Sequence, residues 1–244
     1  MTKRSLGLWM LLVATACLVV FWPAYFFKGS LEALSSGRLQ ILHVEGSIWS
    51  GRASLGLSDG GQVYALPGQV TWSPVFFDDD IWLGVQISHP SLLNPLQAGR
   101  VVDGYLLTDG QARLPASWLT SLGAPFNTIK PEGILQVSWN ELFMPDGELY
   151  VSVIWRDAQS ALSSIRPLGE YKTVLTGEIG GAVDMDLSTQ SGALMLEGKG
   201  RFEPGQRMNF QGYAWAKEES KAALTGLLSQ MGRLEDGRYR LGVF

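Results

Sequence analysis

Few residues in this sequence could carry acid–base, nucleophilic or metal chemistry. There are two histidines, His43 and His89, and a single cysteine, Cys17. No spacing of His, Cys and acidic residues matches a zinc site. No G-x-S-x-G elbow is present, and no second member of a Ser-His-Asp set can be identified. We therefore expect no catalytic residue, no bound metal and no cofactor, and we interpret the chain as not being an enzyme.

Three other patterns are candidates for chemistry, and each has a simpler interpretation. Asp184 and Asp186 share one face of an alternating segment, which suits acid–base work but equally a solvated strand. Glu197–Gly205 is glycine-rich and contains Lys199, yet it lacks the spacing of a phosphate loop, which favours a hairpin. The adjacent acids Asp78–Asp80 would project in different directions, which favours a solvated turn over a calcium site.

An uncharged apolar run covers Leu6–Phe27, and Lys28 ends it. At about 1.5 Å per residue the run spans roughly 33 Å, enough to cross a hydrocarbon core of about 30 Å. Ala14–Ala16 followed by Cys17 resembles the cleavage site of a secretory or lipoprotein signal. However, the apolar residues continue well past that point, whereas a signal's apolar core ends before the cut. We expect an uncleaved single-pass anchor.

The flanking charges predict how this anchor is oriented. Lys3 and Arg4 precede the run, and by the positive-inside rule they keep the N-terminus in the cytoplasm. The expected organisation is a cytoplasmic stub and transmembrane anchor over residues 1–28, a juxtamembrane linker, or alternatively a short helix, over 29–37, and a periplasmic β-rich domain over 38–244. The predicted location is the bacterial inner membrane.

The charge balance restricts the class of partner. The chain has 19 basic and 23 acidic residues, a net charge of −4 at pH 7, and no basic cluster. Because a duplex-binding surface needs concentrated Lys and Arg, nucleic acid is excluded as a partner.

From Arg38 onward, apolar and polar residues alternate with the period of two that is typical of half-buried strands. No helix separates successive strands, which excludes parallel crossover units. The sequence predicts a mainly β fold: a single N-terminal transmembrane helix followed by one strongly curved, mostly antiparallel sheet with a few short helices. Asp109-Gly110 predicts a hairpin turn. The expected helices cover Pro115–Leu122, Asp157–Ile165 and Glu218–Met231.

The stretch Val44–Leu55 predicts a sharp corner in that sheet. Gly46 and Gly51 bracket Ser47–Ser50, and glycine permits the positive φ or the bulge that a sharp bend needs. In this interpretation Trp49 seals the inner surface of the bend, and Arg52 is a lone cation beside it.

The order of the motifs resembles the protein N family of the bacterial type II secretion system. The most specific element is Gly46–Ala53, and the second combines Trp155–Ala158 with Pro167–Tyr171. The resemblance covers most of residues 38–244. The motif and structural residues that we single out are Gly46, Trp49, Ser50, Gly51, Arg52, Trp72, Trp155, Arg156, Asp157 and Gly169.

The resemblance implies an accessory inner-membrane component of the machinery that exports folded proteins from the periplasm across the outer membrane. It offers no catalytic residues, so the expected mode of action is protein–protein contact with other type II secretion subunits, for example by β-augmentation at a sheet edge. A weaker similarity to AsmA-like envelope proteins implies an alternative, a lipid-binding or envelope-remodelling module that holds lipid in an apolar concave face.

Overall fold

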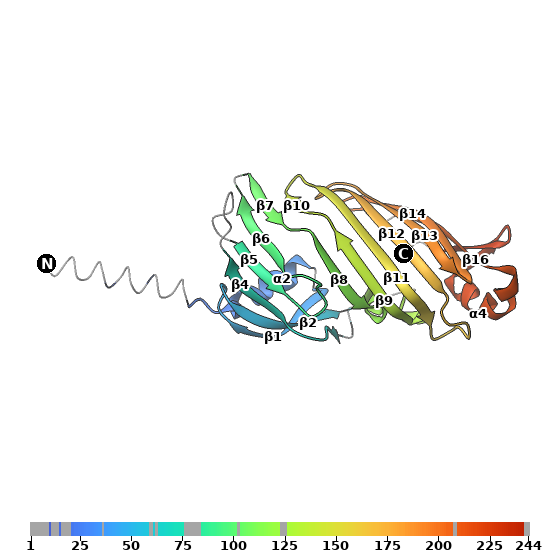
Figure 1. Cartoon of the computed structure of the whole chain (residues 1–244), viewed down its shortest axis with the longest axis horizontal. Coiled ribbons are helices and arrows are strands. Elements are labelled where there is room, and N and C mark those ends of the chain that lie inside the picture. The colour runs from blue at the N-terminus through green and yellow to red at the C-terminus, as the bar shows by residue number, and fades with distance from the viewer. Residues whose placement is uncertain are drawn as a thin grey trace.

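The computed structural model describes residues 10, 15, 21–35, 37–58, 61, 63–75, 84–101, 103–122, 126–206 and 209–241. Over these residues the protein consists of two antiparallel sheets that follow one another along the long axis of the molecule, with short helices (Figure 1). The mainly β character that the sequence predicted is confirmed. The single sheet is wrong, because the chain forms two.

The first sheet has eight strands in the order β1-β2-β4-β5-β6-β7-β10, with β3 paired to β2. Its strands are β1 (Leu39–Gly46), β2 (Gly51–Ser58), β3 (Val63–Ala65), β4 (Val70–Val75), β5 (Gly84–Ser88), β6 (Leu96–Val101), β7 (Gly104–Leu107) and β10 (Leu142–Met144).

The second sheet has nine strands in the order β16-β17-β15-β14-β13-β12-β11-β9-β8. Its strands are β8 (Gly110–Pro115), β9 (Pro131–Trp139), β11 (Glu148–Ser160), β12 (Gly169–Glu178), β13 (Val183–Gly192), β14 (Leu194–Phe202), β15 (Asn209–Ala216), β16 (Gly232–Glu235) and β17 (Arg238–Leu241).

The helical elements are short and most of them lie against the second sheet. They are η1 (Ala24–Phe27), α2 (Lys28–Leu34), η2 (Ala116–Leu122), α3 (Phe126–Ile129), η3 (Glu218–Ser220) and α4 (Lys221–Met231). The expected helices over Pro115–Leu122 and Glu218–Met231 therefore correspond to η2 and to η3 followed by α4.

The main core lies where α4 covers the far end of the second sheet. In β15, Phe210, Ala214 and Ala216 are buried and alternate with exposed neighbours, as period two requires. They pack with Leu224 and Leu227 of α4, which are almost completely buried.

The predicted hairpin at Asp109-Gly110 is wrong, and its position is where the chain leaves the first sheet for the second. β7 pairs with β6 and β10, whereas β8 pairs with β9. Trp139 packs at this crossing point. Its indole N–H donates to the Thr108 carbonyl at 3.2 Å, and its ring lies so close to Gly110 that a Cβ there would overlap it.

The two sheets are nevertheless joined at this junction. The segment Ser91–Leu93, which connects β5 to β6, pairs with the outer edge of β8 through an isolated bridge between Leu92 and Ala112. The Arg113 N–H donates to the Ser91 carbonyl at 2.7 Å, and the Leu93 N–H donates to Gln111 at 2.9 Å. Over the described residues the sheets twist without curling into one strongly curved surface (Figure 1), so that predicted curvature is not confirmed.

The helix predicted over Asp157–Ile165 is also wrong. β11 continues to Ser160, and Asp157 adopts a φ of 49° at a bulge in that strand. Aspartate at the start of an apolar run reads as a helix cap, but its short polar side chain also tolerates this left-handed conformation.

The expected anchor over Leu6–Phe27 lies mostly outside the described residues. Among the residues that are described, no helix combines the length and the apolar character needed to cross a bilayer. The domain boundaries at 28, 37 and 38 stay a prediction.

We expect the packing of α4 to dominate the stability of the second sheet. Leu224 is 0% exposed, so Leu224→Ala leaves a cavity and should lower the free energy of unfolding by about 2–5 kcal/mol. Gln230→Ala, at an exposed position of the same helix, should change it by about 0.5 kcal/mol at most. Denaturant unfolding of the two variants measures both values, and equal effects would contradict this assignment of the core.

Candidate contact surface and the motif residues

The first family motif, Gly46–Ala53, forms the tight hairpin that joins β1 to β2. The Ser47 N–H donates to the Ser50 carbonyl at 2.9 Å, and the Ser47 hydroxyl accepts hydrogen bonds from the N–H groups of Trp49 and Ser50. Gly46 has a φ of 95°, which a residue with a Cβ rarely adopts. The predicted need for a positive φ is therefore met at Gly46.

Trp72 of β4 packs against this hairpin. Its indole N–H donates to the Ser47 carbonyl at 3.1 Å. A Cβ at Gly51 would overlap both the Trp72 ring and the Glu45 carbonyl oxygen, so Gly51 is required for space. Trp49 is half-buried in the turn, and its predicted role in sealing an inner surface stays a prediction. The motif residues thus converge on one corner, although they come from two separate stretches of sequence.

Arg52 is not the lone cation that the sequence predicted. The register of β1 and β2 places it opposite Glu45, and its guanidinium contacts that carboxylate at 2.6 Å. His43 lies 2.8 Å from the other Glu45 oxygen. The hydrogen bond with His43, followed by that from Arg52, lowers the pKa of the Glu45 carboxyl. All three side chains are solvent-exposed, so the group is a surface ion cluster of small energetic weight.

The second family motif combines Trp155–Ala158 with Pro167–Tyr171, and its first part forms the bulge of β11. The pairing of β11 with both neighbouring strands shifts register between Trp155 and Gln159, which places Arg156 and Asp157 in the bulge. Opposite them, Gly133 has a φ of 109°, and a Cβ there would lie 2.6 Å from the Asp157 carbonyl oxygen. A bulge of this kind bends a strand and increases its twist.

Trp155 and Gly169 hold the bulge against the core. The Trp155 indole N–H donates to the Glu132 carbonyl at 2.9 Å, and its ring lies 5.7 Å from that of Tyr171. Tyr171 is 2% exposed and donates to the Leu194 carbonyl at 2.9 Å; burial raises the pKa of its phenol. A Cβ at Gly169 would overlap the Ser191 carbonyl oxygen and would lie 3.0 Å from the Tyr171 hydroxyl.

The candidate carboxylates lie on a solvated face, as the simpler interpretation predicted. Asp184 faces Arg201 at 3.0 Å and Asp186 faces Lys199 at 3.8 Å across the β13–β14 pair. Within the described part of the chain, no three His, Cys, Asp or Glu side chains lie close enough together to hold a metal ion. Asp78–Asp80 fall outside the described residues.

One face of the first sheet carries a mostly apolar strip across β4–β7 and β10. Neighbours in the strand register share this face, for example Trp72 with Ile87, and Leu107 with Leu142. The strip ends in the exposed pair Tyr105 and Met144, at 56% and 39% exposure. We call this surface the apolar strip; its members are Trp72, Val85, Ile87, Leu96, Ala98, Tyr105, Leu107, Leu142 and Met144. The exposed Arg100 lies on the same face, opposite Tyr105.

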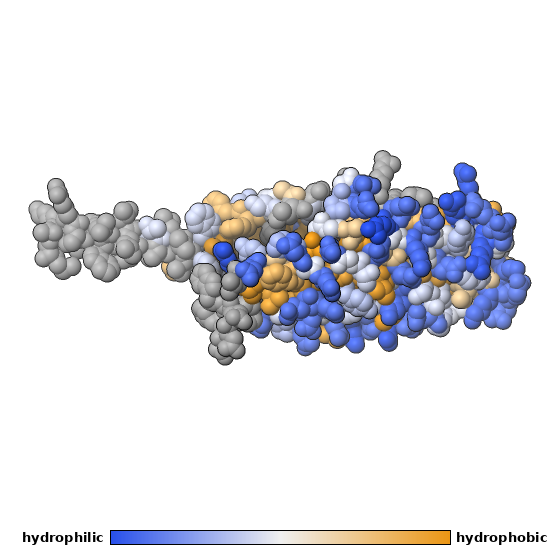
Figure 2. Space-filling model, turned by 90° about the horizontal axis from the view of Figure 1, so that it is seen from above, coloured by the Kyte–Doolittle hydropathy of each residue, from blue (hydrophilic) through white to orange (hydrophobic). Residues whose placement is uncertain are grey.

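The apolar strip differs from the apolar face of the second sheet because no described helix packs extensively on it. α3 and α4 cover the second sheet, and η2 lies against β2, β3 and β9. Every member of the strip is at least partly exposed. On the face seen in Figure 2, apolar residues gather over the half of the molecule nearest the N-terminus, and hydrophilic residues cover the other half. Alternation in Gly84–Ser88 predicted a strand face here, but only the pairing shows which residues of the neighbouring strands share that face.

The fold and these sites define an extended antiparallel β protein whose motif residues shape a hairpin and a bulge. A family model described as type II secretion system (T2SS), protein N, matches residues 37–242, a range that contains both motifs. The chain belongs to this family and has a role in type II secretion.

A curated relative supports the same assignment. The chain is 25% identical to the type II secretion system protein N of Klebsiella pneumoniae, over 246 residues that cover 96% of this chain and 92% of that protein. No solved structure matches the chain. The resemblance that the sequence motifs indicated is confirmed.

We expect Gly51→Ala to destabilise the hairpin, because the new methyl group meets the Trp72 ring and a backbone carbonyl. The free energy of unfolding should fall by about 1–3 kcal/mol. Gly226→Ala is the matched control, since a Cβ at that exposed helix position meets nothing within 4 Å. It should raise stability by roughly 0.5–1 kcal/mol. Chemical denaturation measures the free energy of unfolding of both variants. An unchanged value for Gly51→Ala would show that the hairpin can accommodate a methyl group at this position.

His89 should make the first sheet less stable in weak acid. Its Nδ1 accepts the Ser91 N–H at 3.0 Å, and burial lowers the pKa of the imidazole from 6.5, which the Pro67 backbone only partly offsets. The unfolded chain therefore binds more protons than the folded protein below about pH 6.5, and stability falls as the pH drops through this region. His89→Asn keeps an acceptor for Ser91 but does not titrate.

Melting temperatures of the two proteins between pH 8 and pH 5 measure this effect. The wild type should lose more stability than the variant over that range. Parallel pH profiles would show that His89 does not contribute.

Proposed function

We propose that the protein is a non-catalytic subunit of the type II secretion machinery that works by contact, and that its partner covers the apolar strip. The observation that carries the proposal is the unequal covering of the two sheets. Helices α3 and α4 pack against the apolar face of the second sheet, whereas Tyr105 and Met144 end an apolar surface on which no helix of the described residues packs extensively.

The form of the strip fits a protein partner. Contiguous apolar surfaces with polar surroundings are typical of protein–protein contact sites. On β4 and β5 the opposite face is mostly polar, with Thr71 paired to Ser88 and Gln86 paired to Gln97 of β6. A partner would therefore distinguish the two faces of the first sheet by their apolar character.

The proposed setting is the inner membrane, with the N-terminus in the cytoplasm and the bulk of the chain in the periplasm. The uncharged run Leu6–Phe27 and the preceding Lys3 and Arg4 support it. Tethering of this kind raises the local concentration of the domain near other membrane-bound secretion subunits. The proposal of no enzymatic activity is supported by the scarcity of histidine and cysteine in the sequence.

The lipid-binding alternative has less support. A hollow of 210 Å³ lies at the junction of the sheets, lined by Gln111, Arg113 and Gln136 among others. This volume is below the roughly 300–1,000 Å³ that is typical of small-molecule sites, and the lining is partly polar. A contact function therefore remains our proposal.

We expect Tyr105→Glu to impair secretion. A carboxylate placed within an apolar contact loses its hydration, which should weaken partner binding by about 1–3 kcal/mol, or roughly tenfold or more. Tyr150→Glu is the matched control, because Tyr150 is 38% exposed and lies on the polar face of the second sheet. The measurement is the amount of exported protein in the medium of cells that carry the complete machinery.

Crosslinking identifies what the strip contacts. A photoreactive residue at position 105 should capture a secretion subunit, and the same residue at position 150 should not. Equal secretion by the two glutamate variants, or capture of phospholipid instead of protein at position 105, would contradict the proposal.

A further inference from the structure

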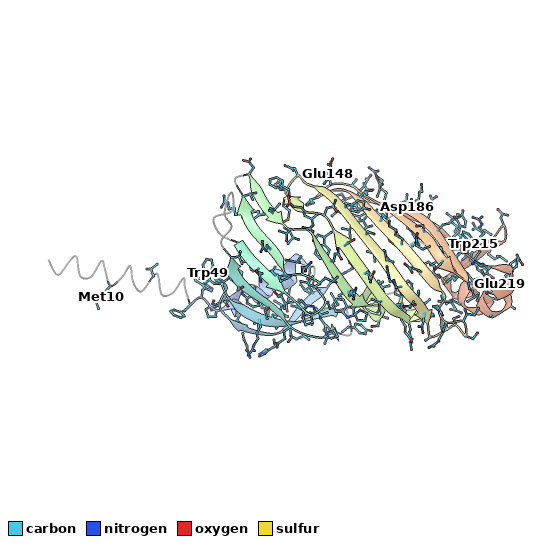
Figure 3. All side chains as sticks on the ribbon, viewed as in Figure 1. Met10, Trp49, Glu148, Asp186, Trp215 and Glu219 are labelled. Carbon is cyan, nitrogen blue, oxygen red and sulfur yellow. The ribbon has the colours of Figure 1, made fainter. Side chains whose placement is uncertain are left out.

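A group of exposed aromatic side chains lies where the apolar N-terminal run meets the β sheets. Their exposed fractions lie between 45% and 73%, although large aromatic rings are usually mostly buried. We call this group the aromatic collar; its members are Phe21, Trp22, Tyr25, Phe26 and Phe27. Figure 3 places Trp49 of the first hairpin at this end of the molecule and Trp215 at the opposite end.

The backbone of the collar is paired with the first hairpin. The Ile48 N–H donates to the Trp22 carbonyl at 3.0 Å, and Pro23 and Ser47 form an antiparallel bridge. Ala24, the next residue, is 7% exposed. The hairpin of the most specific motif therefore holds the collar directly, since two adjacent residues of each segment are in register.

Over the described residues, helical elements and hydrogen bonds connect the collar to β1. The 3-10 helix of the collar passes into α2 without an intervening residue, in the region that the sequence predicted to be a juxtamembrane helix or linker. The Glu32 carboxylate of α2 accepts the Ile41 N–H at 3.0 Å, and the Ser35 hydroxyl accepts the Leu39 N–H at 3.0 Å. Two separate sets of hydrogen bonds thus connect the collar region to the edge of the first sheet.

We propose that the aromatic collar lies in the headgroup layer of a phospholipid bilayer, and that its pairing with the β1–β2 hairpin sets the orientation of the sheets relative to the membrane. This inference rests on the proposed membrane setting. It goes beyond it, because an anchor on a flexible linker would leave the orientation free.

The residue types of the collar favour a lipid bilayer as the environment that it contacts. Trp and Tyr are enriched where a membrane meets water, because each has an apolar ring and a polar group. Trp22 and Tyr25 lie at the end of the uncharged run Leu6–Phe27, and Lys28 follows immediately. An apolar run, then aromatic rings, then a cation is the order expected along a chain that leaves the hydrocarbon core for water.

The first experiment measures the depth of the collar. The full chain with Cys17→Ala is reconstituted in phosphatidylethanolamine–phosphatidylglycerol vesicles, and a nitroxide is attached to a single cysteine introduced as Tyr25→Cys. Relaxation by oxygen and by a water-soluble nickel chelate should place this label near the headgroups. The control label, introduced as Tyr150→Cys, should be fully aqueous.

Two results would overturn the placement of the collar. One is a label at position 25 that is as aqueous as the label at position 150. The other is a label at position 25 that neither quencher reaches, since this would show protein covering the collar. Flotation of the chain with the vesicles reports the anchor by itself, so loss of the anchor is distinguishable from a wrong depth.

The second experiment measures the orientation of the strands. Polarised infrared spectra of the wild type in aligned bilayers should show dichroism of the amide I band. Ile48→Pro removes the donor to Trp22, and a short Gly/Ser insert between Phe27 and Lys28 separates the collar from α2. The double variant should lose the dichroism, and the same insert between Gly180 and Gly181 should retain it.

If circular dichroism shows that the double variant does not fold, the variant with the insert alone replaces it in the infrared experiment. A partial loss of the amide I dichroism is then expected. Unchanged dichroism in a folded variant would overturn the rigid coupling. Crosslinking through position 105 reports the contact function separately, so either proposal can fail without the other.

Discussion

An antiparallel sheet has two faces, and the helices of the described residues bury only part of one of them. The alternation of β15 places Phe210, Ala214 and Ala216 on a single side. α4 is the helix that removes this side from water. Because hydrophobic burial is the main favourable term in folding, the well-packed core lies at the C-terminal end of the second sheet, and the first sheet stays only half-buried.

The two family motifs contribute to this architecture through backbone geometry. Gly46 and Gly51 allow the hairpin to close beneath Trp72, and Asp157 with Gly133 allows β11 to bulge beside Tyr171. A tryptophan indole N–H donates to a backbone carbonyl at each motif and again at the sheet junction, where Trp139 contacts Thr108. In each case a large ring packs against a turn or a strand end that has little room for additional atoms.

Both proposals rest on exposed surfaces of the N-terminal half. The apolar strip and the aromatic collar lie there, and no helix of the described residues packs extensively on the strip. If the collar lies in the membrane interface, then the orientation of the strip relative to the bilayer is set by the same hairpin. A subunit built in this way would present a defined surface to partners in the envelope, and its stability would come from the distant end of the molecule.

Local patterns were sufficient for the strands, for the helix after Glu218 and for the positive φ at Gly46, because period two, helical spacing and glycine freedom act over a few neighbouring residues. The family was also identifiable from short motifs. Local patterns failed at Asp109-Gly110, where a good turn pair is a crossing between sheets, and at Asp157, where a cap residue occupies a bulge. The partner of Arg52, the contact of Trp72 with Gly51 and the uncovered apolar strip all depend on strand register. Register is decided by pairing between residues far apart in the chain, so only the tertiary structure specifies it.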